Sequence, residues 1–491
     1  MFSFIIALAA LVVGYIFYGK FIEKTFGADN RPTPAVTKAD GVDYIIMPTW
    51  KIFMIQFLNI AGTGPIFGAI MGAKFGPSSY LWIVFGCIFA GAVHDYLSGM
   101  LSMRNEGAGL PTLVGKYLGN RTKNVMLVFT VLLLIMVGAV FVYSPVQILG
   151  GMTEGFFDEK ETAMYVWIVV IFVYYIIATM MPVDKIIGRI YPLFAFSLLF
   201  MALSLLVMLF VKWPSLPELW DGLGNRTESL GVMNQPIFPC LFITIACGAI
   251  SGFHATQSPL MARCVKHEKY GRPIFYGSMI TEGVVALIWA TVASYFFFDG
   301  GHEALGAPKG LGTSAPEVVT TVADGWLGKF GAVLALLGVV AAPITSGDTA
   351  LRSARLIIAD FAKLAQKTIK SRLLVCIPLF ALTMLVLWFN IEKPDGFNVI
   401  WSYFGWANQT LSVFTLWTIT VFLALSKKPY IITMIPAVFM TGVCTTFLFI
   451  SKNSLGSLEV FSNPVIGYAV GAVSMVCSVA LFSHWLKKIK K

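Results

Sequence analysis

The stretch Asn59-Ile-Ala-Gly-Thr-Gly-Pro-Ile-Phe-Gly68 decides how this chain folds. It lies in the middle of an apolar run, residues 50–73, that is long enough to cross a lipid bilayer as a helix. Between positions 62 and 68 the run holds three glycines and one proline. Proline removes a helical hydrogen bond, and glycine costs roughly 1 kcal/mol relative to alanine inside a helix. We therefore predict a break here, which lipid tolerates only where the backbone is buried in protein or lines a cavity.

A second interrupted stretch, Cys247-Gly-Ala-Ile-Ser-Gly-Phe-His-Ala-Thr-Gln-Ser-Pro259, follows in the other half of the chain, with Gly248 lying 186 residues after Gly62. A pair of Gly/Pro-interrupted apolar segments in corresponding halves points to the binding site of a transporter. The alternative is that both are ordinary glycine kinks or close-packing helix faces. The polar residues gathered in both stretches favour the binding site.

The composition is that of a helical integral membrane protein. Of the 491 residues, 57% are hydrophobic and 12% are charged, with a mean hydropathy of +0.79. Soluble domains are about one quarter charged. Long apolar runs fit helices rather than the alternating strands of an outer-membrane barrel. Seven cysteines occur without a Cys-x-x-Cys pair, which indicates neither a disulfide framework nor a zinc site.

Thirteen apolar segments are candidate membrane spans, so we expect an all-α fold of about 13 transmembrane helices. The first lacks a basic leading region, and we expect a retained helix rather than a cleaved signal. The expected spans are roughly 2–19, 50–73, 78–101, 124–147, 163–182, 190–211, 236–257, 274–298, 330–346, 373–390, 397–425, 430–450 and 463–486.

Lysine and arginine are unevenly distributed over the loops between these spans. When the loops are numbered alternately, 27 of the 35 basic residues, including Lys367, fall on one side, and 8, including Lys309 and Lys452, fall on the other. Such an excess marks the cytoplasmic side, so we predict an N-terminus outside and a C-terminus in the cytoplasm. In a soluble protein the net charge of +10 would suggest nucleic-acid binding. Here the basic residues of the cytoplasmic loops account for it.

The two interrupted spans enter the membrane from opposite sides in this topology. Five spans separate them, which is the pattern of an inverted-topology repeat of five plus five helices. The architecture is similar to the leucine-transporter type, an analogy that fixes no substrate. We expect an N-terminal helix and loop in 1–49, repeats in 50–211 and 236–425, and two accessory helices in 426–491.

Ionisable residues inside the expected spans are few, and such residues mark functional sites by default. They are His94, Asp95, His254, Glu282 and Asp348. The topology places the acids and His254 in the cytoplasmic half, which predicts that they cluster there.

Each of these residues also has a structural interpretation. Asp95 could pair with a basic residue such as Arg104, and Glu282 could face a loop cation. His254 could be a packing histidine with satisfied hydrogen bonds. Asp348 could be the N-cap of the helix that follows it, since aspartate is favoured there.

A coupling cation is expected where the first and eighth repeat helices meet. Carbonyls around 61–63, with hydroxyls of 345–349, would suit sodium, because hard cations prefer oxygen ligands. A buried carboxylate such as Asp95 or Asp348 would instead suit a proton, which we favour. The predicted coupling-ion residues are His94, Asp95, Thr345, Ser346, Asp348 and Thr349.

The substrate is expected at the breaks, because half-helix N-termini present free N–H groups and a positive dipole end that suit an anion. A third interruption, 405–409, could line the route or be a polar packing seam between helices. The predicted substrate-binding residues are Asn59, Gly62, Thr63, Gly64, Ser251, Gly252, His254 and Gln257.

Four motifs together resemble the carbon starvation protein A (CstA) family, in its shorter form, over about residues 1–490. The resemblance implies an inner-membrane importer of peptides or of pyruvate, with proton coupling usual for the pyruvate members. The motifs are Asn59-Ile-Ala-Gly-Thr-Gly-Pro-Ile-Phe-Gly68, His94-Asp-Tyr-Leu-Ser98, Cys247-Gly-Ala-Ile-Ser-Gly-Phe-His-Ala255 and Thr345-Ser-Gly-Asp-Thr-Ala-Leu-Arg-Ser-Ala-Arg355.

We therefore expect a secondary transporter that imports a small carboxylate or a short peptide by cation-coupled alternating access. The sequence contains no nucleotide-binding motif of the form Gly-x-x-x-x-Gly-Lys-Ser/Thr, so we do not expect an ATP-driven pump. Five scattered histidines form no catalytic constellation, so we expect no enzyme and no cofactor. A passive channel or a substrate-sensing receptor is the alternative class, and the choice between pyruvate and peptide stays open.

Overall fold

A computed structural model describes most of the chain and gives an all-helical membrane protein. Lys185, Lys309, Lys367, Lys393, Lys452 and Lys491, which enter the charge count, lie outside the described residues. The structure describes residues 1–41, 43–157, 160–180, 187–227, 235–307, 313–364, 366, 368–392, 396–451, 454–458, 460 and 463–490.

Helices make up almost all of this part of the chain, and the described residues contain no β-strand. Short π-helical turns, including Gly64–Gly68 and Trp82–Gly91, interrupt several of them. The helices are α1 Phe2–Val13, α2 Gly19–Phe26, α3 Pro34–Thr37, α4 Thr49–Ile60, α5 Ala69–Ala73, α6 Ser78–Leu81, α7 Ala92–Arg104, α8 Leu110–Leu118, α9 Asn120–Thr153, α10 Lys160–Met180, α11 Ile187–Lys212, α12 Ile237–Thr244, α13 His254–Ala262, α14 Gly277–Phe298, α15 Gly301–Ala304, α16 Ala315–Phe361, α17 Ile369–Glu392, α18 Gly396–Leu425, α19 Ile431–Ile450 and α20 Pro464–Lys490.

Within the described residues, 11 helices are long and apolar enough to cross a membrane, or up to 12 if one bent pair is a single span. That pair is Thr49–Ile60 with Gly64–Ala73, bent by 56°. The expected span 236–257 corresponds to α12 and α13, which are too short to qualify separately. The count of thirteen therefore stays a prediction.

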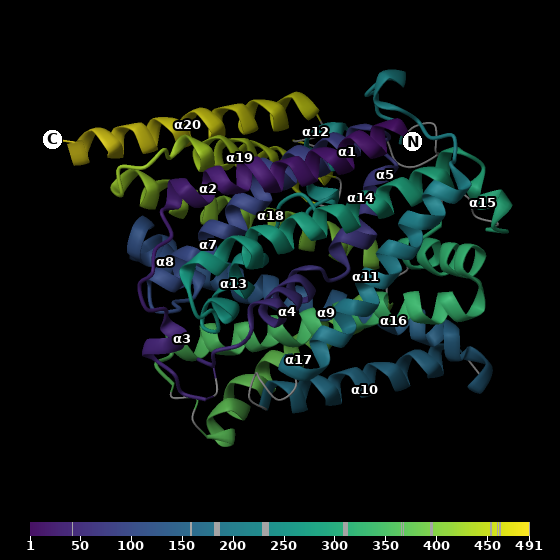
Figure 1. Cartoon of the computed structure of the whole chain (residues 1–491), viewed down its shortest axis with the longest axis horizontal. Helices are drawn as coiled ribbons and strands as arrows, with labels where there is room; N and C mark the ends of the chain where they lie inside the picture. The colour runs from purple at the N-terminus through teal and green to yellow at the C-terminus, as the bar shows by residue number, and fades with distance from the viewer. Residues whose placement is uncertain are drawn as a thin grey trace.

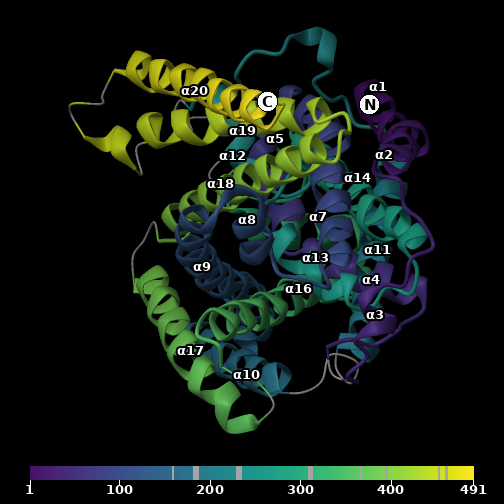
Figure 2. The same ribbon diagram turned by 90° about the vertical axis from the view of Figure 1, so that its left-hand side faces the viewer.

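Most helices run along the long axis of the molecule, with the two termini toward opposite ends (Figure 1). Seen end-on, α7, α13 and α16 lie toward the centre of the bundle, while α19 with α20 and α10 with α17 lie at its edges (Figure 2). The residues of both breaks, 61–63 and 245–253, are buried, as a broken backbone in lipid requires.

Two expected boundaries are wrong. Asp348 is not an N-cap, because α16 runs without interruption through 345–349 and on to Phe361. The hydroxyl of Thr345 bonds back to the carbonyls of Ala341 and Ala342, both at 2.9 Å. A Cβ on Gly347 would overlap the hydroxyl of Tyr175. That glycine therefore permits close packing against α10 and does not end the helix.

The third expected interruption, 405–409, is also continuous helix within α18. A Cβ on Gly405 would lie 2.9 Å from the carbonyl oxygen of Ile243. Gly405 therefore lets α18 approach α12 closely, and this polar segment is a packing seam between helices.

Candidate functional site

The first break separates α4 from the π-helical turn that begins at Gly64. Ala61 leaves the helical region, with φ −81° and ψ 58°, and the chain turns helical again as it enters Pro65. The residues from Gln56 to Ile70 are all buried. The predicted break is therefore confirmed, and it is enclosed in protein.

The second break, residues 245–253, lies between α12 and α13 and includes Gly248 at φ +90°. Asn408 on α18 fixes its far end. The side-chain oxygen of Asn408 accepts hydrogen bonds from the Ser251 hydroxyl at 3.0 Å and from the Phe253 backbone N–H at 2.7 Å. Its backbone carbonyl accepts the N–H of Gly252 at 3.2 Å. The polar seam of α18 thus holds the second break in shape.

The two breaks pack directly against each other. A Cβ on Gly64 would overlap the Cβ and Sγ atoms of Cys247. A Cβ on Gly68 would lie 2.9 Å from the carbonyl oxygen of Thr244. The close contact with Cys247 therefore explains why position 64 is glycine. Gly252 is similarly constrained, because its Cβ would lie 2.6 Å from the backbone of Leu411 in α18.

Unpartnered polar groups line one face of the first broken span. Gln56 and Asn59 are three residues apart on α4, which places them on one side of the helix, and Thr63 lies in the break that follows. They are fully buried, and no hydrogen bond satisfies either amide or the Thr63 hydroxyl. Buried polar groups normally have partners, so this face needs a functional explanation. The sequence analysis missed Gln56, although its spacing from Asn59 could have revealed it.

Gln257 adds a polar group from α13, which packs against α4. Its side-chain N–H donates to the Thr256 hydroxyl at 2.8 Å, and its carbonyl oxygen is buried without a partner. Four predicted substrate residues therefore carry buried polar side-chain atoms without a hydrogen bond: Asn59, Thr63, His254 and Gln257.

A chain of buried titratable groups, here called the His254 cluster, joins α7, α13 and α14. Asp95 contacts the Nδ1 atoms of His94 at 2.7 Å and of His254 at 2.8 Å. The other ring nitrogen of His254 lies 3.5 Å from a carboxylate oxygen of Glu282. All four side chains are fully buried. The predicted gathering of Asp95, His254 and Glu282 is therefore seen, with His94 added.

Arg104 does not pair with Asp95. Its guanidinium makes two hydrogen bonds of 3.0 Å to the carboxylate of Glu268. Glu282 faces His254 rather than a loop cation. The structural interpretations offered for Asp95 and Glu282 are therefore wrong.

Asp348 lies apart from the His254 cluster, and no described hydrogen bond or ion pair joins the two. One of its oxygens accepts the hydroxyl of Tyr191 at 2.8 Å, and the other is buried without a hydrogen bond. Two residues earlier, the Ser346 hydroxyl donates to the carbonyl of Leu58 at 2.9 Å. The α16 helix therefore meets the first broken span, as expected for spans two and nine. The hydroxyls of Thr345 and Thr349 bond carbonyls of their own helix.

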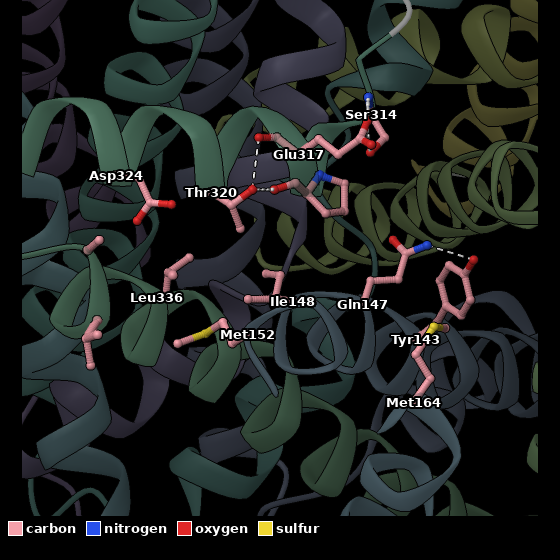
Figure 3. Close-up of a pocket in the computed structure, with 14 residues that line it drawn as sticks. Tyr143, Gln147, Ile148, Met152, Met164, Ser314, Glu317, Thr320, Asp324 and Leu336 are labelled. Carbon is pink, nitrogen blue, oxygen red and sulfur yellow. Dashed lines mark hydrogen bonds between the residues drawn. The ribbon is translucent and has the colours of Figure 1, made fainter. Parts of the chain in front are cut away.

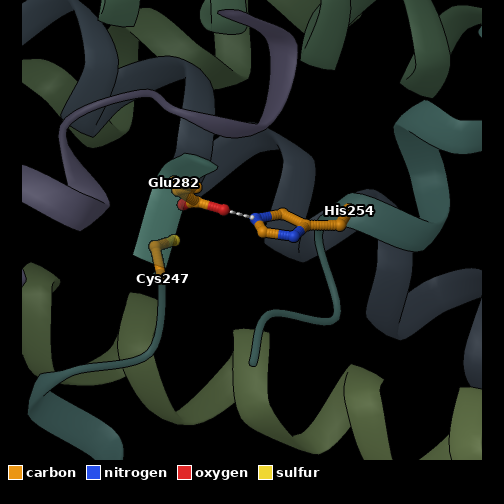
Figure 4. Close-up of side chains that lie close together, drawn as sticks. All are labelled: Cys247, His254 and Glu282. Carbon is orange, nitrogen blue, oxygen red and sulfur yellow. Dashed lines mark ion pairs between the residues drawn. The ribbon is translucent and has the colours of Figure 1, made fainter. Parts of the chain in front are cut away.

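Among the described residues, one group of buried side chains is spaced closely enough to hold a metal ion. A sulfur of Cys247, a ring nitrogen of His254 and a carboxylate oxygen of Glu282 all lie within 4.8 Å of one another (Figure 4). The three side chains come from the second break, α13 and α14 and converge on one point.

A cavity of about 500 Å³ opens between α9, α10 and α16 (Figure 3). This volume is typical of small-molecule pockets. Helix α9 connects this cavity to the first break. Gln147 lines the cavity, and Phe141 precedes it on the same helix by roughly 9 Å along the axis, at 1.5 Å per residue. At the break itself, a Cβ on Gly62 would lie 2.7 Å from the ring of Phe141, so the ring packs directly against this glycine. The lining residues are Tyr143, Gln147, Ile148, Gly151, Met152, Met164, Ser314, Pro316, Glu317, Thr320, Asp324, Ala332, Val333 and Leu336.

Comparison with known sequences finds one family across the chain. The model described as carbon starvation protein CstA matches residues 1–159, 154–333 and 306–447. An uncharacterized membrane protein of Haemophilus influenzae is 48% identical over 339 residues, covering 60% of this chain and 91% of that protein. The peptide transporter CstA of Bacillus subtilis is 26% identical over 592 aligned residues, covering 99% of this chain and 96% of that protein.

Two further comparisons concern a symporter and a solved structure. The pyruvate/proton symporter BtsT of Escherichia coli is 27% identical over 375 residues, covering 64% of this chain and 51%, about half, of that protein. A crystal structure of a manganese transporter from Eremococcus coleocola superposes with a TM-score of 0.57 and 11% identity, covering 92% of this chain and 99% of that one. At this identity the likeness concerns the fold alone.

Proposed function

Because the chain belongs to the carbon starvation protein CstA family, we propose that it is a secondary active transporter that imports a carboxylate-bearing solute by cation-coupled alternating access. It is a multi-pass membrane protein, and its named relatives are transporters, not enzymes. The substrate is a small carboxylate such as pyruvate or a short peptide, which both carry a carboxylate.

The contact between the two breaks is the observation that carries this proposal. Breaks 186 residues apart in sequence meet at Gly64 and Cys247 and are enclosed by surrounding helices. Paired broken helices are how transporters place irregular backbone around a buried substrate. We assign 50–211 and 236–425 to inverted repeats of the leucine-transporter type within thirteen spans of a bacterial inner membrane. The N-terminus lies outside and the C-terminus in the cytoplasm.

The substrate binds along the unpartnered polar face of the first broken span. Amides and hydroxyls both donate and accept hydrogen bonds, so Gln56, Asn59 and Thr63 suit a carboxylate or a peptide group. Gln257 lies on α13, which packs against α4. The glycines shape the breaks that carry these groups. The proposed substrate residues are Gln56, Asn59, Gly62, Thr63, Gly64, Ser251, Gly252, His254 and Gln257.

The coupling ion is a proton, and Asp348 is the group that best supports this assignment. Its carboxylate is fully buried, has one unpartnered oxygen, and lies on the helix that contacts the first broken span through Ser346. Acidic residues inside membrane spans commonly form proton pathways. One relative is also named a proton symporter. Sodium bound near Ser346 is the competing assignment, and the remaining candidates are His94, Asp95, Thr345 and Thr349.

Uptake into proteoliposomes tests the proposal. We expect purified protein to accumulate labelled pyruvate or labelled dialanine above equilibrium when an inward pH gradient is imposed in sodium-free buffer. Accumulation of only one solute identifies the substrate class. Equilibration without accumulation indicates a channel, and binding without uptake indicates a receptor. Strict sodium dependence with indifference to the pH gradient refutes the proton assignment.

A further inference from the structure

We propose that Cys247, His254 and Glu282 form a buried binding site for a divalent transition-metal ion of the zinc type. This site goes beyond the transport function, because metal binding requires no substrate and no coupling ion. Its ligands come from the second break, α13 and α14, so a bound ion would clamp the break to α14.

The spacing of the three ligand atoms fits a metal site. They lie within 4.8 Å of one another, and the His254 nitrogen is already 3.5 Å from a Glu282 oxygen. Zinc binds such ligands at about 2.0–2.3 Å, so in a tetrahedral site the ligand atoms lie roughly 3.5 Å apart. Closing the group around an ion therefore requires side-chain movements of only about 1 Å. Figure 4 shows the imidazole of His254 directed at Glu282, with the thiol of Cys247 beside them.

The ligand atoms make no short hydrogen bond to groups outside the site. The Nε2 atom of His254 and both oxygens of Glu282 are buried without hydrogen bonds. The sulfur of Cys247 makes only long contacts, with the Ser251 hydroxyl at 3.6 Å and the Asn408 amide at 3.7 Å. Buried polar atoms without partners are rare, and each calls for an explanation.

Asp95 prepares the imidazole for this role. Its carboxylate lies 2.8 Å from Nδ1 of His254, and when a neutral imidazole donates that N–H to Asp95, the Nε2 lone pair is free. A carboxylate behind a histidine ligand orients the ring and strengthens it as a ligand at many metal sites. In this tautomer the Nε2 lone pair faces the carboxylate of Glu282. Two electron-pair donors facing each other are stabilised by a cation between them.

The donor set selects the metal class. A thiolate, an imidazole and a carboxylate suit Zn²⁺ and Co²⁺, whereas Mg²⁺ and Ca²⁺ prefer oxygen ligands alone. Three protein ligands leave a fourth position open, as at zinc sites that also hold water. Spacings of 7 and 28 residues between the ligands match no short motif, which is why the cysteine pattern indicated no zinc site.

Binding to purified full-length protein in detergent tests the site. We expect one Zn²⁺ per chain by elemental analysis, and Co²⁺ should produce a thiolate-to-cobalt charge-transfer band in the near ultraviolet. Cys247→Ser should abolish that band. Asp95→Asn should keep the band but weaken binding by about 10- to 100-fold, the usual cost of removing an outer-shell partner.

Cys444→Ser is the matched control, because Cys444 is a buried cysteine on α19 that belongs to no described metal-ligand group. It should bind Zn²⁺ and Co²⁺ as the unmodified protein does. If Cys247→Ser does not fold, the cobalt spectrum of the unmodified protein decides, since it requires no variant. Absence of stoichiometric Zn²⁺, a cobalt spectrum without the thiolate band, or a band that survives in folded Cys247→Ser overturns the proposal. Each outcome is independent of uptake.

Discussion

A size exchange between Gly64 and Cys247 tests whether the two breaks are held by their mutual contact. A Cβ on Gly64 would overlap the Cβ and Sγ atoms of Cys247, and both residues are buried. Extra atoms forced into a well-packed interior typically cost about 1–3 kcal/mol. We expect Gly64→Ala to lower the free energy of unfolding by this amount, measured by equilibrium denaturation in mixed micelles with chelator present.

Cys247→Gly should also destabilise, because it removes a packed side chain. In the double variant, however, the alanine occupies the space that the cysteine side chain vacated. We therefore expect the double variant to be more stable than the sum of the single effects predicts, by about 1 kcal/mol or more, as contacting residues show. Gly151→Ala is the control, because nothing lies within 4 Å of its Cβ position. Additivity within about 0.5 kcal/mol would refute direct packing of the breaks.

The other predictions concern coupling, substrate binding and topology. Asp348→Asn should abolish uptake driven by a pH gradient while substrate exchange continues, and loss of both activities in a folded variant would contradict a role in coupling alone. Gln56→Leu should raise KM for a carboxylate substrate by about 10-fold or more, since a hydrogen bond to a charged group contributes about 1.5–3 kcal/mol. The control is Thr410→Val, which should leave KM unchanged because the Thr410 hydroxyl donates to the Trp406 carbonyl of its own helix. In a variant without the exposed Cys477, a cysteine at Glu161 should react with an impermeant maleimide from outside and one at Lys116 should not, and the reverse labelling would overturn the orientation.

The first break could be predicted from sequence because its cause is local. Glycines and a proline within one short segment disrupt helical hydrogen bonding wherever the segment lies. The same reasoning failed at Gly405, where glycine serves close packing against Ile243 within a continuous helix. A glycine that breaks a helix and one that admits a neighbour look alike until the neighbour is known.

The titratable groups show a similar limit. Their burial was expected from the apolar segments that carry them, but their pairing depends on how helices distant in sequence pack. Asp95 and His254 are separated by 159 residues, and Cys247, which no charge pattern marks, lies close to His254 and Glu282. Asp348 was expected in the same cluster because its depth was judged from a span assumed to end at 346. The longer α16 instead places it against Tyr191.

The α13 helix contacts both groups of titratable residues and is one structural connection between them. Through His254 it contributes to the cluster with Asp95 and Glu282. Through Thr256 and Gln257 it bonds Ser353 of α16, the helix that carries Asp348, at 3.3 and 3.5 Å. Because α13 starts directly at the second break, a change in that break shifts both sets of contacts together. If the breaks rock during transport, as proposed above, these contacts connect the motion to the helix that carries Asp348 without a continuous chain of hydrogen-bonded charges between the two groups.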